Sequence, residues 1–478
     1  MRRTRRLAAG PLTVALLWSG CLTASAHPST ARPASLTSPA PATSRAEQVQ
    51  AAMTRDQQIG QLFMVATPAD TVSSGLRDVV ARQHVGNVIL MGRSTRGADH
   101  IRSVTTAVQR LTEPSAATAG VPAFVSADQE GGQVQVLRGP GYSTMPTALV
   151  QGTRSTSALR ADAQRWGTQL SRSGVNTDLA PVLDTVPTAY KATNEPIGRY
   201  DREFGPLTTT VTAKGGAFRS GMDRAGVATA VKHFPGLGRV RGNTDTTSGV
   251  TDTVTTTTSG VIAPFAAAVD AGTPFVMMSS AYYSKIDPDR PALFSPTIIR
   301  TLLRSRLGFD GVVISDDIGN ARQLAAWTPA QRATTFIGAG GDMVLTARTD
   351  TLPEMVAAVR SKAASDPTFA AKVDAASLRV LRAKEDAGLL DPRVTPTGRF
   401  SPYLVGRVQA WLGTTQTRTW DAATIRSLQY RVGAATTGRW DAASVGALQD
   451  YLGIARSGSK GWDSRTVTQL QRYLATQL

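Results

Sequence analysis

Between residues 61 and 347, short apolar runs recur along the chain and lead into polar or charged residues. There are eight such runs, at residues 61–66, 85–92, 122–128, 176–182, 228–234, 275–281, 311–317 and 342–347. The segments between them carry apolar residues at helical spacing, so we expect strands and helices to alternate. Near-continuous apolar runs are typical of buried parallel strands, and eight strand–helix units predict an α/β fold, a (β/α)8 barrel of the TIM type.

The seventh run closes on two adjacent carboxylates, Asp316 and Asp317. In a (β/α)8 barrel the active site lies at the carboxyl ends of the strands, so the polar run endings are candidate site residues. Neighbouring side chains on one strand point to opposite faces. We therefore expect Asp316 and Asp317 to face different ways, with only one of them aimed at a reacting atom.

The length and charge of the chain indicate an exported protein with more than one domain. At 478 residues it suits a barrel plus an appendage, and its formal net charge is +17. A basic start precedes an apolar run at residues 7–18, and small residues follow it. This pattern is typical of a secretory signal, here residues 1–26, whose apolar core is too short to span a membrane. The basic residues are Arg2, Arg3, Arg5 and Arg6.

Two cleavage sites of this signal compete. Residues 17–21 look like a bacterial lipobox, in which Cys21, the sole cysteine, would carry a lipid anchor in the cell envelope. The A-x-A site Ala24-Ser25-Ala26 would instead release a soluble, secreted protein. We favour the lipoprotein, because the cysteine stands where a lipobox needs it. In both cases the mature chain has no disulfide.

Residues 27–45 are Ala, Pro, Ser and Thr without periodicity, which predicts a disordered tether. The basic balance of the chain is compatible with retention by anionic wall polymers. No basic stretch is interleaved with aromatic residues at a recurring spacing, so nucleic acid is not an expected partner.

The C-terminal segment, residues 400–478, repeats itself. Pairs of Val or Leu with Gln recur at spacings of 20, 20 and 22 residues, and Trp-Asp pairs precede the last three by eight. These are Val408-Gln409, Leu428-Gln429, Leu448-Gln449 and Leu470-Gln471, with Trp420-Asp421, Trp440-Asp441 and Trp462-Asp463. Each Asp can cap a short helix whose apolar residue faces a shared core, which predicts a small all-α domain. The units resemble peptidoglycan-binding repeats, which implies wall binding; the alternative is a helical domain that binds nothing.

Four separated motifs near the run endings resemble one enzyme family. They are residues 126–132 (Ser-Ala-Asp-Gln-Glu-Gly-Gly), 178–184, 232–236 (Lys-His-Phe-Pro-Gly) and 308–317. Their order and spacing, within a domain at residues 46–395, resemble glycoside hydrolase family 3 and in particular its single-barrel β-N-acetylglucosaminidases. The resemblance implies a retaining hydrolase that removes terminal non-reducing β-N-acetylglucosamine from peptidoglycan fragments.

The resemblance also implies roles for individual residues. Asp316 would be the nucleophile that forms a covalent glycosyl intermediate. The residues expected to bind the sugar are Asp128, Arg202, Lys232 and His233. The segment around Arg202 is two residues longer than the family pattern, which leaves Arg199 as a rival. Asp184 would support the barrel mouth without touching the sugar.

The chain departs from the family in the loop after Lys232-His233. The β-N-acetylglucosaminidases usually carry Asp-Ser-His there, with the His as general acid/base, whereas this chain reads Asn243-Thr244-Asp245-Thr246-Thr247. The hydroxyl of Thr247 has no acidity near neutral pH. Three explanations stay open: Asp245 acts directly with a raised pKa, Asp252 substitutes for it, or the acid is absent and the enzyme is slow. We favour Asp245.

Three other functions stay open for this sequence. They are a family 3 β-glucosidase of other sugar preference, a wall-binding pseudoenzyme that lacks the general acid, and a transferase. The histidines do not pair at metal-ligand spacing and no Gly-rich phosphate loop follows a strand, so neither a metal nor a cofactor is expected. A monomer is expected by default.

Overall fold

The computed structural model describes residues 44–112, 114–390, 400, 402–414 and 419–477. The predicted signal peptide, the lipobox with Cys21 and all but the end of the predicted tether lie outside the described residues. The first described helix is α1 (Arg45–Ala52), and a capping box between Ser44 and Glu47 fixes its start. The last residues assigned to the tether therefore belong to the start of this helix.

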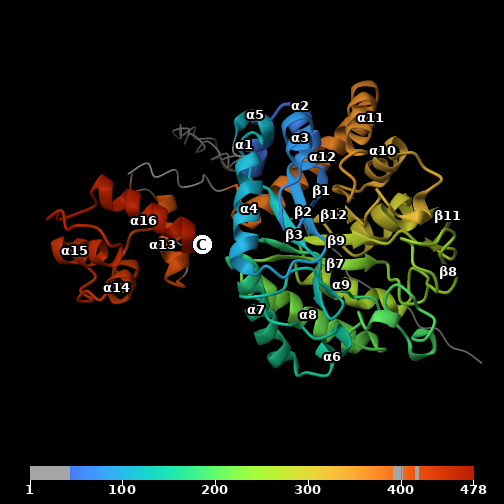
Figure 1. Cartoon of the computed structure of the whole chain (residues 1–478), viewed down its shortest axis with the longest axis horizontal. Coiled ribbons are helices and arrows are strands. Elements are labelled where there is room, and N and C mark those ends of the chain that lie inside the picture. Colours follow the sequence, from blue (N-terminus) through green and yellow to red (C-terminus); the bar gives the residue numbers. More distant parts are fainter. Residues whose placement is uncertain (1–43, 113, 391–399, 401, 415–418, 478) are drawn as a thin grey trace, which may run out of the picture. The chain divides into compact units, whose positions relative to one another are not determined.

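Eight parallel strands form a ring in the order β12-β9-β7-β6-β3-β2-β1-β13 (Figure 1). They are β1 (Phe63–Pro68), β2 (Asn87–Met91), β3 (Phe124–Ala127), β6 (Thr177–Asp178), β7 (Ala228–Phe234), β9 (Phe275–Met278), β12 (Val312–Ser315) and β13 (Val344–Thr346). A parallel bridge between Ile314 and Met343 joins the two ends of this order. Each predicted run contains one strand, so the predicted (β/α)8 barrel is confirmed.

Helices surround the ring, and several short elements belong to the loops that follow the strands (Figure 1). The helices of the barrel region, besides α1, are α2 (Arg55–Gly60), α3 (Ser74–Gln83), α4 (Ala98–Thr112), α5 (Ser115–Thr118), α6 (Ala148–Gly152), α7 (Thr156–Arg172), α8 (Thr208–Arg224), α9 (Ala263–Asp270), a π-helix (Thr297–Arg306), α10 (Pro329–Ala339), α11 (Leu352–Ser365) and α12 (Pro367–Asp386). The loop strands are β4 (Gln129–Gly131), β5 (Val134–Gln135), β8 (Thr251–Asp252), β10 (Tyr282–Tyr283) and β11 (Asp287–Pro291). None of the helices in the described ranges is both long and apolar enough to cross a membrane.

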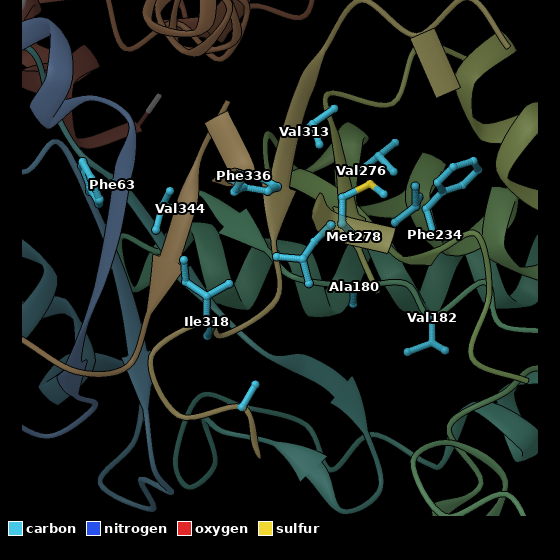
Figure 2. Close-up of a cluster of buried hydrophobic side chains, with 14 of the residues drawn as sticks. Phe63, Ala180, Val182, Phe234, Val276, Met278, Val313, Ile318, Phe336 and Val344 are labelled. Carbon is cyan, nitrogen blue, oxygen red and sulfur yellow. The ribbon is translucent and has the colours of Figure 1, made fainter. Parts of the chain in front are cut away.

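Alternation along the strands divides the barrel core into two clusters. Residues on one face, such as Met64 and Ile314, pack inside the ring, where the rings of Phe124 and Phe275 meet edge to face at 5.2 Å. Residues on the other face pack against the surrounding helices. Figure 2 shows this outer layer, with Phe63, Val276, Val313 and Val344 on strands and Phe336 on α10. Both faces of every strand are buried, which explains the near-continuous apolar runs.

Lys384 on α12 closes the amino-terminal end of the ring. It is fully buried, and its Nζ donates to Gln61 Oε1 at 2.7 Å and to the carbonyl oxygen of Gly86 at 2.9 Å. The same nitrogen lies 5.6 Å from the ring centroid of Phe124. No carboxylate of the described residues pairs with it, and burial lowers the pKa of this amine well below its ordinary value.

The described residues after 399 include four helices, α13 (Pro402–Trp411), α14 (Ala422–Arg431), α15 (Ala442–Tyr451) and α16 (Ser464–Gln477). Asp421 caps α14 and Asp441 caps α15, each by accepting a backbone N–H, as the repeat pattern predicts. The repeated Leu residues at 428, 448 and 470 are fully buried in one core, and the partly buried rings of Trp420, Trp440 and Trp462 pack against it.

The repeated glutamines connect each unit to the next. Gln429 Nε2 donates to Ser444 Oγ and to the carbonyl oxygen of Arg439, both at 2.8 Å. Gln449 Nε2 donates to Thr466 Oγ1 at 2.6 Å. The Val/Leu-Gln pair therefore supplies a core residue and a link to the following unit.

Replacing Lys384 with Met should change how stability depends on pH. The folded-state pKa of Lys384 is lowered, so the unfolded chain binds more protons below the unfolded pKa of about 10.4. Stability of the natural protein should therefore gain a contribution as pH rises from the lowered pKa towards that value, and Lys384→Met should lose this contribution. Calorimetric melting temperatures of both proteins at pH 6 to 9.5 measure the difference; parallel curves would contradict it.

Candidate active site

The candidate active site is a cavity of about 320 Å³ at the carboxyl ends of the barrel strands. All six predicted site residues line it: Asp128, Arg202, Lys232, His233, Asp245 and Asp316. A larger cavity of about 530 Å³ lies at the amino-terminal ends of β7 and β12, beside Ala228 and Gly311, and none of the six residues lines it. Because catalytic residues of this fold gather at the carboxyl ends, the smaller cavity is the candidate site.

Two buried cations share one buried carboxylate at the base of the site. Lys232 Nζ lies 2.6 Å from Glu130 Oε1, and Arg202 donates to both oxygens of Glu130 at 2.8 Å. The side chains of Glu130 and Lys232 are each only 3% exposed. Burial alone would raise the pKa of Glu130, but Arg202 and Lys232 outweigh it and lower the pKa to about 2. Lys232 also contacts Asp128, with Nζ 2.5 Å from Oδ1.

Glu130 is a site residue that sequence reasoning missed. It stands two positions after Asp128, within the motif at residues 126–132 and on the short strand β4. Residues two positions apart on an extended segment face the same way. The carboxylate two positions after Asp128 was therefore the sequence signal that could have predicted Glu130 as a site residue. Its role is to hold Lys232 and Arg202 in place.

His233 is oriented by Asp184, the residue that we expected only to support the barrel mouth. His233 Nδ1 lies 2.7 Å from Asp184 Oδ2, and Asp184 Oδ1 accepts the backbone N–H groups of His233 at 3.2 Å and Leu237 at 2.8 Å. Asp184 is fully buried and does not line the cavity. Asp184 therefore fixes the imidazole of His233 and the following loop without lining the cavity itself.

The structure places Arg202, and not its rival Arg199, in the cavity. Arg199 is exposed and does not belong to the lining. The longer segment is held by Lys191, whose Nζ lies 2.6 Å from Asp201 Oδ1 and also contacts Glu203. These two acids flank Arg202, so their contacts with Lys191 hold the segment on both sides of it.

The premise that Asp316 and Asp317 both lie on a strand is wrong, because β12 ends at Ser315; both residues line the cavity, but their carboxylates have different partners. Asp317 Oδ1 accepts the backbone N–H groups of Gly319 at 2.8 Å and Ala347 at 2.9 Å, so this carboxylate holds the loop. Asp316 accepts one backbone N–H, that of Asp317, at 2.8 Å. Asp316 is therefore the better placed of the two to meet a substrate.

The loop after β7 brings Asp245 into the cavity and leaves Thr247 out of the lining. Backbone N–H groups of residues 322 and 323 donate to the carbonyl oxygens of Asp245 and Thr244 at 3.1 and 3.0 Å, which fixes this loop beside the segment after β12. Asp252 is buried elsewhere, and its carboxylate accepts the backbone N–H groups of Val254 and Thr255 at 2.7 Å. Asp252 is therefore not placed to act in the cavity.

The electrostatics of the cavity raise the pKa of Asp245. Desolvation and the carboxylates of Asp316 and Asp317 raise its pKa to about 6, against the opposing effects of His233 and Arg202. The residue keeps contact with solvent, so the two neighbouring carboxylates are the firmer cause of the shift. In the part of the chain that the structure describes, no group of three or more His, Cys, Asp or Glu side chains could hold a metal ion.

Comparisons with known proteins agree with this site. The Glycosyl hydrolase family 3 N terminal domain matches residues 54–383. A β-hexosaminidase of Xanthomonas oryzae pv. oryzae is 30% identical over 310 residues, which cover 63% of this chain and 88% of that protein. The crystal structure of the β-N-acetylhexosaminidase from Beutenbergia cavernae has a TM-score of 0.69 at 52% identity, covering 70% of this chain and 99% of that one.

A family 3 β-N-acetylglucosaminidase from Paenibacillus sp. str. FPU-7 has a TM-score of 0.63 at 26% identity, covering 70% of this chain and 63% of that one. Fold and site together define a glycoside hydrolase. The chain belongs to glycosyl hydrolase family 3, as its motifs predict.

Replacing Glu130 with Gln should destabilise the protein and weaken substrate binding together. The change leaves Lys232 and Arg202 adjacent and buried without their shared anion. Loss of one partner of such a buried pair costs about 3–5 kcal/mol in the free energy of unfolding. Urea unfolding measures this loss, and steady-state kinetics should show a raised KM. Asp350→Asn removes an exposed partner of Arg348 and is the control; equal effects of the two substitutions would contradict the assigned role of Glu130.

Proposed function

We propose that this protein is an exported retaining β-N-acetylglucosaminidase that removes terminal non-reducing β-N-acetylglucosamine from peptidoglycan fragments. The main support is one cavity that combines two acids, Asp316 and Asp245, with the charged groups that would bind a sugar. Family membership and relatives named β-hexosaminidase, β-N-acetylhexosaminidase and β-N-acetylglucosaminidase point to the same substrate class.

The proposed reaction has two steps. In the first, Asp316 attacks the anomeric carbon while Asp245 protonates the departing glycosidic oxygen, which gives a covalent glycosyl-Asp316 intermediate. In the second, Asp245 takes a proton from water, the water attacks the anomeric carbon, and the bond to Asp316 breaks. Two inversions leave the β configuration unchanged.

Asp245 suits the acid/base role because a carboxyl group with a pKa of about 6 can both donate and accept a proton near neutral pH. A general acid works best when its pKa lies near the working pH. Thr247, at the position of the family's histidine, lies outside the lining and has no comparable acidity. The carboxylate of Asp245 therefore replaces the expected imidazole.

The remaining residues suit recognition of one sugar ring at the end of a chain. Lys232, Asp128 and Arg202 present charged donors and acceptors, and His233 stands beside them with its ring fixed by Asp184. A volume of about 320 Å³ is at the lower end of the range of roughly 300–1,000 Å³ usual for small-molecule sites. This size favours removal of one terminal residue.

The sequence supports a location at the cell envelope. The predicted signal, a lipid anchor at Cys21, the tether at 27–45 and the net charge of +17 all suit a protein that is exported and retained near anionic wall polymers. The repeats at 400–478 would add binding to the wall. We expect the protein to be a monomer, in which the single barrel binds the glycan substrate.

Asp316→Asn should abolish hydrolysis, because an amide cannot form the glycosyl ester. The purified mature protein is incubated with 4-nitrophenyl β-GlcNAc and with a GlcNAc-MurNAc disaccharide, beside the variant and the Asp350→Asn control. Release from both substrates that depends on Asp316 supports the proposal. Binding of wall fragments without any release by the natural protein would instead identify a pseudoenzyme.

Asp245→Asn should affect the two substrates differently. For the disaccharide kcat/KM should fall by about 10²–10⁴-fold, because its leaving group needs a proton, whereas 4-nitrophenol leaves readily and the first step on that substrate should suffer much less. Added azide, which attacks without a general base, should accelerate turnover of the 4-nitrophenyl substrate by the variant. Thr247→Ala is the control, and unchanged disaccharide turnover by Asp245→Asn would eliminate Asp245 as the acid.

The dependence of kcat/KM on pH should report the ionisation of Asp245. Asp245 must be protonated to act as an acid, so kcat/KM of the natural protein for the disaccharide should decline as pH rises through about 6. The Asp245→Asn variant should lose this decline. A rate that stays constant from pH 5 to 8 would be inconsistent with the assignment.

A further inference from the structure

The helices α14 and α15 are successive copies of one unit, yet their grooves differ. A cavity of about 500 Å³ lies beside α14, and its lining consists of Leu412, Arg426, Ser427, Tyr430, Arg431 and Thr436. The framework of the two copies is the same, because the Trp-Asp and Leu-Gln pairs recur 20 residues later. The difference is concentrated in the residues that line the groove.

In the second copy an ion pair stands at the positions equivalent to two residues that line the first groove. Asp450 and Arg456 stand 20 residues after Tyr430 and Thr436, and Arg456 Nε donates to both oxygens of Asp450 at 3.1 Å. Arg456 lies against Gly446, where an added Cβ would meet its Nε at 3.3 Å. The ion pair therefore replaces Tyr430 and Thr436 of the first copy, and Arg456 lies beside the position equivalent to Arg426.

In the first copy no such pair exists, and the groove presents polar and aromatic groups to solvent. Tyr430 is 82% exposed. The guanidinium of Arg431 lies 5.2 Å from the ring centroid of Trp411. Neither Arg431 nor Arg426 forms an ion pair with an acid among the described residues of this domain. Two arginines and one exposed ring therefore remain available to a ligand.

The charge of the domain leaves these arginines uncompensated. Residues 400–478 contain nine Lys or Arg and four Asp. Asp421, Asp441 and Asp463 accept the N–H groups of helix starts, and Asp450 is paired with Arg456. No acidic side chain of the domain is left for the groove.

We propose that the first groove binds a carboxylate-bearing glycan–peptide strand of the wall. A guanidinium presents a planar set of donors that matches a carboxylate, and Arg426 and Arg431 would pair with the free carboxylates of such a strand. The apolar face of a sugar ring would pack on Tyr430. This inference rests on the proposed wall binding of the repeats and assigns it to one of their two grooves.

Sedimentation of the full-length protein with insoluble peptidoglycan tests the assignment, with Asp316→Asn as the background so that the wall is not digested. The double variant Arg426→Ala/Arg431→Ala should raise the Kd by about tenfold or more. The double variant Tyr430→Asp/Thr436→Arg, which copies the Asp450–Arg456 ion pair of the second copy, should do the same. Arg439→Ala/Arg465→Ala removes two exposed charges elsewhere in the domain and should leave the Kd within about twofold.

A second ligand preparation distinguishes carboxylate recognition from general attraction. Peptidoglycan with amidated carboxylates should bind the natural groove as weakly as untreated material binds the Arg426→Ala/Arg431→Ala variant. Near-ultraviolet circular dichroism of the clustered tryptophans verifies that each variant is folded.

The outcomes separate the two proposals. Tight binding that all groove variants retain would overturn the groove assignment and leave wall binding intact, as would equal binding of amidated material. No binding of the natural protein would overturn both. Proteins that carry the same groove substitutions and keep Asp316 should hydrolyse 4-nitrophenyl β-GlcNAc at the natural rate. This result would show that the barrel site acts independently of the groove.

Discussion

The closure of eight parallel strands into one ring is the constraint on which the site depends. Closure buries both faces of each strand, so the polar residues of the strands and their following loops can only gather at the rim. The ring joins where β12 and β13 meet, through Ile314 and Met343. Asp316 follows this junction directly, and its position is therefore fixed by the last pairing of the ring.

The charges at this rim fall into two groups with opposite properties. Lys232 and Arg202 are held against Glu130 and Asp128, so that buried charge is compensated and the cations keep one geometry. The carboxylates of Asp316, Asp317 and Asp245 form no ion pair with a residue that the structure describes, and the repulsion from Asp316 and Asp317 raises the pKa of Asp245. Retaining hydrolysis needs two carboxyl groups whose pKa values differ, beside charged groups that hold the sugar in one geometry.

The sequence predicted the barrel well, because burial on both sides gives each strand a readable apolar run. It also placed six residues in the cavity, since motifs at strand ends converge in this fold. Glu130 was missed because its role depends on two cations, Arg202 in a loop 72 residues away and Lys232 on β7, 102 residues away. The placement of Asp316 and Asp317 on a strand was wrong because the end of β12 at Ser315 cannot be predicted from the sequence of the run. The groove beside α14 was not predicted, since exposed residues carry no periodic signal.

The bond from Lys384 to Gln61 joins residues that are 323 positions apart. A chain that emerges from the ribosome with its amino end first makes β1 long before it makes α12. The amino-terminal end of the ring therefore stays open until nearly the whole domain has been synthesised. In the export that we propose, this late closure would delay compaction of the chain and keep it competent for translocation.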